Sequence, residues 1–181
     1  QHLELCRDIA QKFNTDFEIE NFLQVPEPLI QKEFSRIMSL KDGSKKMSKS
    51  ELSDLSRINL TDDKDLIINK IKKAKTDPLP MPNTLKELDE RLEAKNLLGI
   101  YSSLTNSTLQ KSVENFAGKN FSEFKQKLSE ALVDKIEPIS TEIKKLLDDK
   151  SYLDNTLLEG VERANIIASK KIKRIKEIVG F

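Results

Sequence analysis

Apolar residues recur at intervals of three and four along residues 61–181, and this spacing is the strongest constraint on the fold. The last such run contains Leu157, Val161, Ala164, Ala168, Ile172, Ile175 and Val179. This period places apolar side chains on one face of an α-helix, where they need a packing partner. The chain has only 5 glycines and 6 prolines, which disfavours a turn-rich β fold. The sequence therefore predicts a mainly α protein that ends in a helical bundle.

Short signals predict where these helices begin. The predicted starts are Thr61-Asp62, Thr84 with Glu87, Ser107 with Gln110, and Asn120 with Glu123, the last three having the spacing of capping boxes. The segment from Asp77 to Pro82 contains three prolines and predicts an extended linker. Pro138 is expected to bend or restart its helix because proline cannot donate the usual backbone hydrogen bond.

Cys6 is the only cysteine and His2 the only histidine. These counts exclude an internal disulfide, a Cys/His metal cluster and most histidine acid–base chemistry, so no metal ligand is assigned. Both residues are interpreted as structural, and the cysteine usage favours an intracellular protein. No apolar run approaches the roughly 18 residues of a membrane span, and no secretory leader is expected.

Residues 1–60 lack the sustained helical spacing of the later part of the chain. Leu5, Ile9 and Phe13 predict an amphipathic helix with no start signal before it, so we expect further sequence upstream. The runs 22–25 and 36–40 suit short strands or extended loops. Residues 41–44 are turn residues, and Gly43 is interpreted as a hinge.

The segment Lys46-Met47-Ser48-Lys49-Ser50 carries the clearest chemistry in the sequence. Two ammonium groups three residues apart can stabilise negative charge that develops on phosphate oxygens, and the two serines can donate to the same oxygens. Read alone, these five residues could equally be a surface loop in a chain rich in lysine and serine. Further lysines cluster at 41–49, 64–75 and 170–176, which indicates either phosphate contacts or solvated helix faces.

The residues around this loop resemble one family throughout the chain. Lys-Met-Ser-Lys-Ser is the signature loop of class I aminoacyl-tRNA synthetases, and the run 36–50 closely resembles tryptophanyl-tRNA synthetases of the bacterial and organellar type. Further matches are Gln1-His2-Leu3-Glu4-Leu5, Lys70-Ile71-Lys72-Lys73-Ala74, Asn96-Leu97-Leu98-Gly99, Phe124-Lys125, Pro138-Ile139 and Glu159-Gly160. One departure is Glu51-Leu52, where the family commonly has Asp and Pro.

The resemblance implies roles for individual residues. Ile37 and Met47 would lie against the adenine of ATP. Lys46 and Lys49 would hold its pyrophosphate end and act as the catalytic pair, with Ser48 and Ser50 completing the ATP-binding set. Mg²⁺ would be bound together with ATP. Spacing alone would not have identified adenine as the ligand.

The resemblance also implies an organisation into two domains. Residues 1–60 would be the trailing piece of a Rossmann-like α/β nucleotide-binding domain, and residues 61–181 a helical domain that binds tRNA(Trp), including its anticodon arm. The full enzyme would activate tryptophan with ATP, transfer it to tRNA(Trp), form a homodimer and work in the cytoplasm or an organelle matrix without membrane attachment.

Two features of the family's active site are not found in these residues. They are the upstream His-Ile-Gly-His-like segment and the amino-acid pocket, so this chain alone is expected to be inactive. The alternative interpretation is a non-catalytic, helical nucleic-acid-binding or adaptor module.

Overall fold

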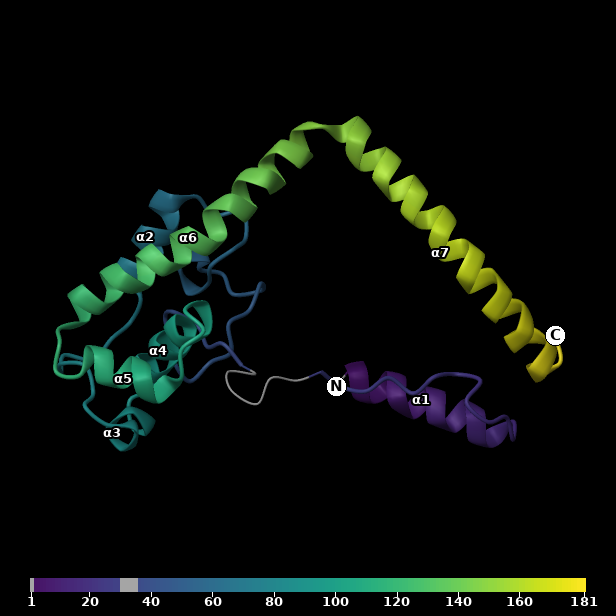
Figure 1. The fold of residues 1–181 in the computed structure, drawn as a ribbon, viewed down its shortest axis with the longest axis horizontal. Helices are drawn as coiled ribbons and strands as arrows, with labels where there is room; N and C mark the ends of the chain where they lie inside the picture. Colours follow the sequence, from purple (N-terminus) through teal and green to yellow (C-terminus); the bar gives the residue numbers. More distant parts are fainter. Residues whose placement is uncertain (1, 30–35) are drawn as a thin grey trace. The chain divides into compact units, whose positions relative to one another are not determined.

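The computed structural model describes residues 2–29 and 36–181. Gln1, which opens the family resemblance, and residues 30–35, which belong to the predicted 1–60 domain, lie outside the described residues. Within the described ranges the chain forms seven α-helices and one 3₁₀-helix (Figure 1). They are α1 (His2–Asp16), η1 (Asp54–Ser56), α2 (Lys64–Lys73), α3 (Leu85–Asp89), α4 (Leu92–Leu104), α5 (Leu109–Phe116), α6 (Phe121–Asp148) and α7 (Lys150–Val179).

The predicted mainly α class is confirmed, and the chain divides into two compact units. One contains the described residues 36–150, and the other contains residues 2–29 together with 151–181. None of the helices in the described ranges combines the length and hydropathy needed to cross a bilayer.

The unit of residues 36–150 has one hydrophobic core built from the predicted apolar stripes. Helix α6 packs against both α2 and α4, while α3 and α5 pack against α4 (Figure 1). Tyr101, Phe116 and Phe124 meet edge to face, with ring centroids 4.9–6.0 Å apart. Leu40 also belongs to this core, so the segment that leads to the lysine loop is packed against the helices.

Two of the predicted helix starts differ from the structure by one or two residues. Helix α2 is capped by Asp63, whose carboxylate accepts from the Leu66 amide at 2.9 Å, rather than by Thr61-Asp62. Helix α5 is capped by Thr108 rather than Ser107. In both cases a neighbouring residue of similar chemistry occupies the extended cap position, and local spacing cannot distinguish the two.

The other helix signals have mixed outcomes. Thr84 caps α3 as predicted, accepting from the Glu87 amide at 3.2 Å. Asn120 precedes α6 but makes no side-chain capping bond. Pro138 does not restart the helix, because α6 continues through it from Phe121 to Asp148.

The predicted strands do not form a sheet in the described residues. Residues 22–25 form a bend and irregular chain in which the Asn14 side chain bonds both backbone groups of Leu23, and segment 36–40 makes a single antiparallel bridge between Met38 and Lys46. A strand needs a neighbour to satisfy its backbone groups, and these segments find theirs in loops and side chains instead. The extended-loop interpretation is therefore the one that the described residues support.

The unit of α1 and α7 buries little apolar surface. Phe13 contacts both Phe17 and Phe22, and the Lys171 ammonium lies 4.1 Å from the centroid of the Phe22 ring. Ala10 is the only buried residue of α1, while α7 buries none of its side chains within the described residues. The bundle predicted for residues 61–181 is therefore found from α2 to α6, whereas the α7 stripe remains exposed.

Candidate nucleotide-binding loop

The segment before the lysine loop is fixed by three neighbouring elements. The Leu40 amide donates to the Ser56 carbonyl at 2.9 Å, and the Lys75 amide donates to the Leu40 carbonyl at 2.7 Å. The side-chain amide of Asn96 on α4 bonds both backbone groups of Met38, at 2.9 and 2.8 Å. These bonds hold the extended backbone next to Ile37 in one position, although no sheet surrounds it.

The turn at residues 41–45 is closed by Asp42. Its carboxylate accepts from the Ser44 hydroxyl at 2.6 Å and the Ser44 amide at 3.0 Å, and these bonds lower the pKa of the Asp42 carboxyl. Gly43 is buried, and a Cβ added there would lie 2.9 Å from backbone atoms of Leu92 and Glu93. This close approach to α4 gives a reason for glycine that the hinge interpretation did not include.

Gly43→Ala should destabilise the unit of residues 36–150. The added methyl group meets backbone rather than a flexible side chain, and overpacking of this kind costs about 1–3 kcal/mol. Urea unfolding measures the loss. Gly160→Ala on α7 is the matched control, because no atom of the described residues lies within 4 Å of its added Cβ. The packing argument fails if Gly43→Ala is as stable as the unsubstituted protein.

The tip of the loop, residues 46–50, has few restraints. The Met47 amide donates to the Ile37 carbonyl at 3.0 Å, and the Met47 side chain packs against the core. The Ser48 and Ser50 hydroxyls lie 2.8 Å apart. Lys46 and Lys49 are exposed, and neither forms an ion pair with another described residue. Both cations are therefore available to an anionic ligand.

The structure brings together some of the residues that sequence analysis selected. Ile37 and Met47 are neighbours through their shared backbone bond, and Ile37 is 45% exposed, so an apolar ligand could rest on it. Lys46 lies opposite Met38 in the antiparallel bridge. Within the described ranges, no three acidic, histidine or cysteine side chains gather as potential metal ligands.

The exit from the loop is held by residues whose structural role sequence analysis did not identify. The Arg57 guanidinium donates to the Glu51 carbonyl at 2.9 Å, and the fully buried Lys70 ammonium lies 2.6 Å from both Asp54 and Asp62. The donors Lys70 and Asn59 lower the pKa of the Asp54 carboxyl. A signal existed, because Lys70 falls on the same helix face as Ile67, Ile71 and Ala74.

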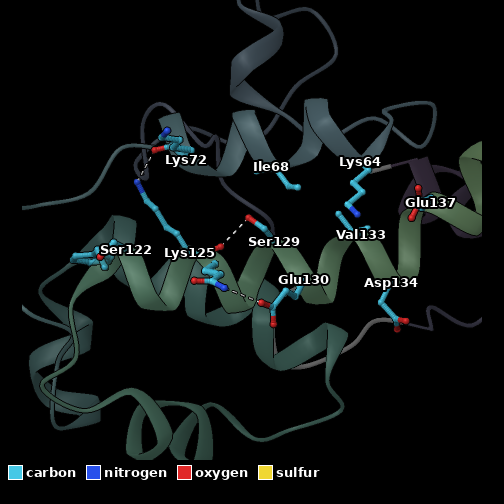
Figure 2. A pocket seen from close by; sticks show the side chains of 12 residues that line it. Lys64, Ile68, Lys72, Ser122, Lys125, Ser129, Glu130, Val133, Asp134 and Glu137 are labelled. Atoms are coloured by element: carbon cyan, nitrogen blue, oxygen red, sulfur yellow. Dashed lines mark hydrogen bonds between the residues drawn. The ribbon is translucent and has the colours of Figure 1, made fainter.

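A groove of about 840 Å³ lies between α2 and α6, away from the loop (Figure 2). At one end the Lys125 ammonium donates to the Ala74 carbonyl at 2.7 Å and the Lys72 carbonyl at 3.2 Å, so it caps the last turn of α2. Burial lowers the pKa of Lys125. Exposed lysines and carboxylates both line the groove, which gives it no single charge preference.

Comparison with known proteins decides which family the chain represents. The family described as tRNA synthetases class I (W and Y) matches residues 1–137. The chain belongs to this family. The resemblance found around the lysine loop is thereby confirmed over most of the sequence.

Individual members of the class I synthetases are similar over the whole chain. The tryptophan–tRNA ligase of Caulobacter vibrioides is 49% identical over 181 residues, and that of Rickettsia felis is 50% identical over 181 residues. The match covers all of this chain but 53% and 54% of those proteins. A crystal structure of Mycoplasma pneumoniae tryptophanyl-tRNA synthetase superposes with a TM-score of 0.80 at 28% identity, covering 99% of this chain and 53% of that one. The chain thus spans about half the length of the relatives it matches.

Proposed function

We propose that this class I synthetase chain is the part of a tryptophan–tRNA ligase that carries the ATP-phosphate loop and a helical tRNA-binding domain. The observation that carries the proposal is the state of Lys46 and Lys49. Both are exposed and unpaired with other described residues, on a short loop fixed at its entry and exit. The 49–50% identity to tryptophan–tRNA ligases supports tryptophan as the proposed substrate.

The loop would act while tryptophan is activated. The tryptophan carboxylate attacks the α-phosphate of ATP, which forms tryptophanyl-adenylate and releases pyrophosphate. Lys46 and Lys49 would stabilise the charge that grows on the leaving pyrophosphate, with Ser48 and Ser50 as donors. Mg²⁺ bound with ATP would share that charge. Ile37 and Met47 would contact the adenine, and the terminal hydroxyl of tRNA(Trp) would take the acyl group in the second step.

The domain assignment forms part of the same proposal. Residues 1–60 would complete a Rossmann-like nucleotide-binding domain, and residues 61–181 would meet tRNA(Trp) and its anticodon arm. The packing of Leu40 with the helical core supports direct coupling between the loop and the helices. The ligase would act as a homodimer, in the cytoplasm or an organelle matrix.

Pyrophosphate exchange tests the proposal. A protein of the relatives' full length that carries this sequence, here termed the full-length ligase, should exchange labelled pyrophosphate into ATP only when tryptophan is present. The 181 residues alone should not do so. Tyrosine is the control amino acid. A full-length ligase without tryptophan-dependent exchange would favour the adaptor interpretation.

Binding of tRNA(Trp) to the full-length ligase should weaken steeply with salt. Lys72 and Lys73 are exposed on α2, whereas Lys70 is buried and cannot reach a phosphate, which corrects the predicted contact cluster. Each phosphate that a substitution leaves without its lysine should reduce the slope of log K against log salt by about 0.7–0.9. Lys72→Gln with Lys73→Gln should therefore flatten the slope measurably, and Lys86→Gln with Lys111→Gln is the matched control. An unchanged slope would remove α2 from the interface.

A further inference from the structure

The buried Lys70 ammonium has two carboxylate partners that differ in their exposure to solvent. Asp62 is 4% exposed and comes just before α2, so among the described residues it alone provides a buried countercharge for Lys70. Asp54 is 49% exposed, lies in η1 and stands four positions after Ser50. An exposed second carboxylate adds little to stability, because water already solvates it. Its position after the loop suggests another use.

Asp54 connects the buried lysine to the exit of the loop through a continuous series of contacts. Its Oδ2 lies 2.6 Å from the Lys70 ammonium, and its Oδ1 lies 3.1 Å from the Arg57 guanidinium. The same guanidinium donates to the Glu51 carbonyl, one residue beyond Ser50. Charge-assisted bonds of this kind are short and directional, so the loop exit is tied to a rigid helix.

The 3₁₀-helix η1, which contains Asp54, also contacts the backbone on the entry side of the loop. The Ser56 carbonyl in η1 accepts from the Leu40 amide at 2.9 Å, and Leu40 leads back to Ile37. Asn59 joins the two carboxylates, since its side-chain amide donates to Asp54 at 3.0 Å and to Asp62 at 3.2 Å. The backbone on both sides of the loop is therefore bonded to η1 or to its neighbour Arg57, and η1 is in turn held to α2 by the Asp54–Lys70 ion pair.

We propose that Asp54, held by Lys70, is a positioning residue that places the lysine loop for adenylate formation. This inference rests on the proposed ligase function. Lys46 and Lys49 stabilise a transition state only when they reach it in the correct geometry, and the tip of the loop has few restraints of its own. Anchoring the exit reduces the conformations that the loop must search. Asp54 touches no substrate and acts through the two lysines.

Asp54→Ala in the full-length ligase measures this effect. We expect kcat for tryptophan-dependent pyrophosphate exchange to fall about 10- to 100-fold, as for other misplacements of catalytic groups. KM for tryptophan should stay within about twofold because the anchor is remote from that substrate. Asp54→Glu should recover part of kcat, since it keeps the carboxylate. Substitution of Lys70 is unsuitable here, because it leaves Asp62 buried without its countercharge.

Asp63→Ala is the matched control. Asp63 caps the same helix but contacts neither η1 nor the loop exit among the interactions of the described residues. It should lower the melting temperature at least as much as Asp54→Ala while leaving kcat unchanged. If both variants lost kcat in proportion to stability, Asp54 would be merely structural and the inference overturned.

A double mutant tests whether Asp54 acts through the loop. Asp54→Ala should reduce kcat by a smaller factor in the Lys49→Ala enzyme than in the unsubstituted enzyme. The reason is that one of the two ammonium groups that Asp54 is proposed to position is already absent. Fully multiplicative losses would contradict the inference.

Hydrogen exchange distinguishes this inference from the proposed function, since it needs no activity. Amides of residues 51–57 should exchange faster in Asp54→Ala but not in Asp63→Ala. An enzyme without tryptophan-dependent exchange would refute the function, whereas an active enzyme whose Asp54→Ala variant keeps full kcat would refute only the positioning role.

Discussion

Lys49→Ala or Lys46→Ala should slow tryptophanyl-adenylate formation by the full-length ligase about 100- to 1000-fold, the usual cost of removing one positioned charge donor. Negative charge on the pyrophosphate grows as the α-phosphate bond breaks, so each ammonium interacts more strongly with the transition state than with bound ATP. ATP affinity should therefore change much less than the rate. Single-turnover kinetics separates the two quantities.

The positions of Lys46 and Lys49 should allow their substitution to report on catalysis without a change in stability. Lys46 and Lys49 are exposed and form no ion pair with other described residues, so their removal should leave the fold intact. Lys45→Ala is the matched control, because Lys45 is adjacent in sequence but lies 3.6 Å from Asp42. It should keep most of the rate. Arginine at position 46 or 49 should rescue only partly, since its planar fork does not reproduce a compact point charge.

Ile37→Ala should show the opposite pattern. Ile37 is 45% exposed beside Met47, where an adenine contact would be the same before and during the reaction. Uniform binding of this kind affects ATP affinity more than the chemical step. If the lysine variants lost only ATP affinity and kept their rate, the assigned mechanism would be wrong.

Lys70→Met should destabilise the unit of residues 36–150 by about 3–5 kcal/mol, which is typical of removing one partner from a buried ion pair. Asp62 is 4% exposed and lies 2.6 Å from the Lys70 ammonium. Without that cation its carboxylate stays buried with no countercharge, whereas Asp54 can turn to solvent. Since single domains are stable by only about 5–15 kcal/mol, the loss should be evident in urea unfolding.

A second substitution tests the physical cause of that loss. Adding Asp62→Asn to Lys70→Met removes the uncompensated buried charge, and the asparagine oxygen can still accept from the Asn59 backbone amide, which donates to Asp62 at 2.9 Å. It should recover more than half of the lost stability. Lys73→Met, on the exposed face of the same helix, should cost nothing measurable. No recovery in the double variant would show that packing, and not charge, dominates at Lys70.

Local information in the sequence determined most of the helices and the family to which the chain belongs. The three-to-four spacing of apolar residues predicted α2, α4 and α6, because that period reflects a helix's own geometry, while the start of α5 was predicted from the spacing of a capping box. The run from Arg36 to Ser50 identified the family through contiguous residues.

Only the tertiary structure decided which charged and apolar residues are buried. Lys70 falls on the apolar stripe of α2, but spacing could not reveal that Asp54 in η1 and Asp62 in the segment before α2 would converge on it. Gly43 lies against α4, a contact made across about fifty positions of sequence. The α7 stripe satisfies the helical period yet stays exposed, because periodicity defines an apolar face while burial requires a partner for that face.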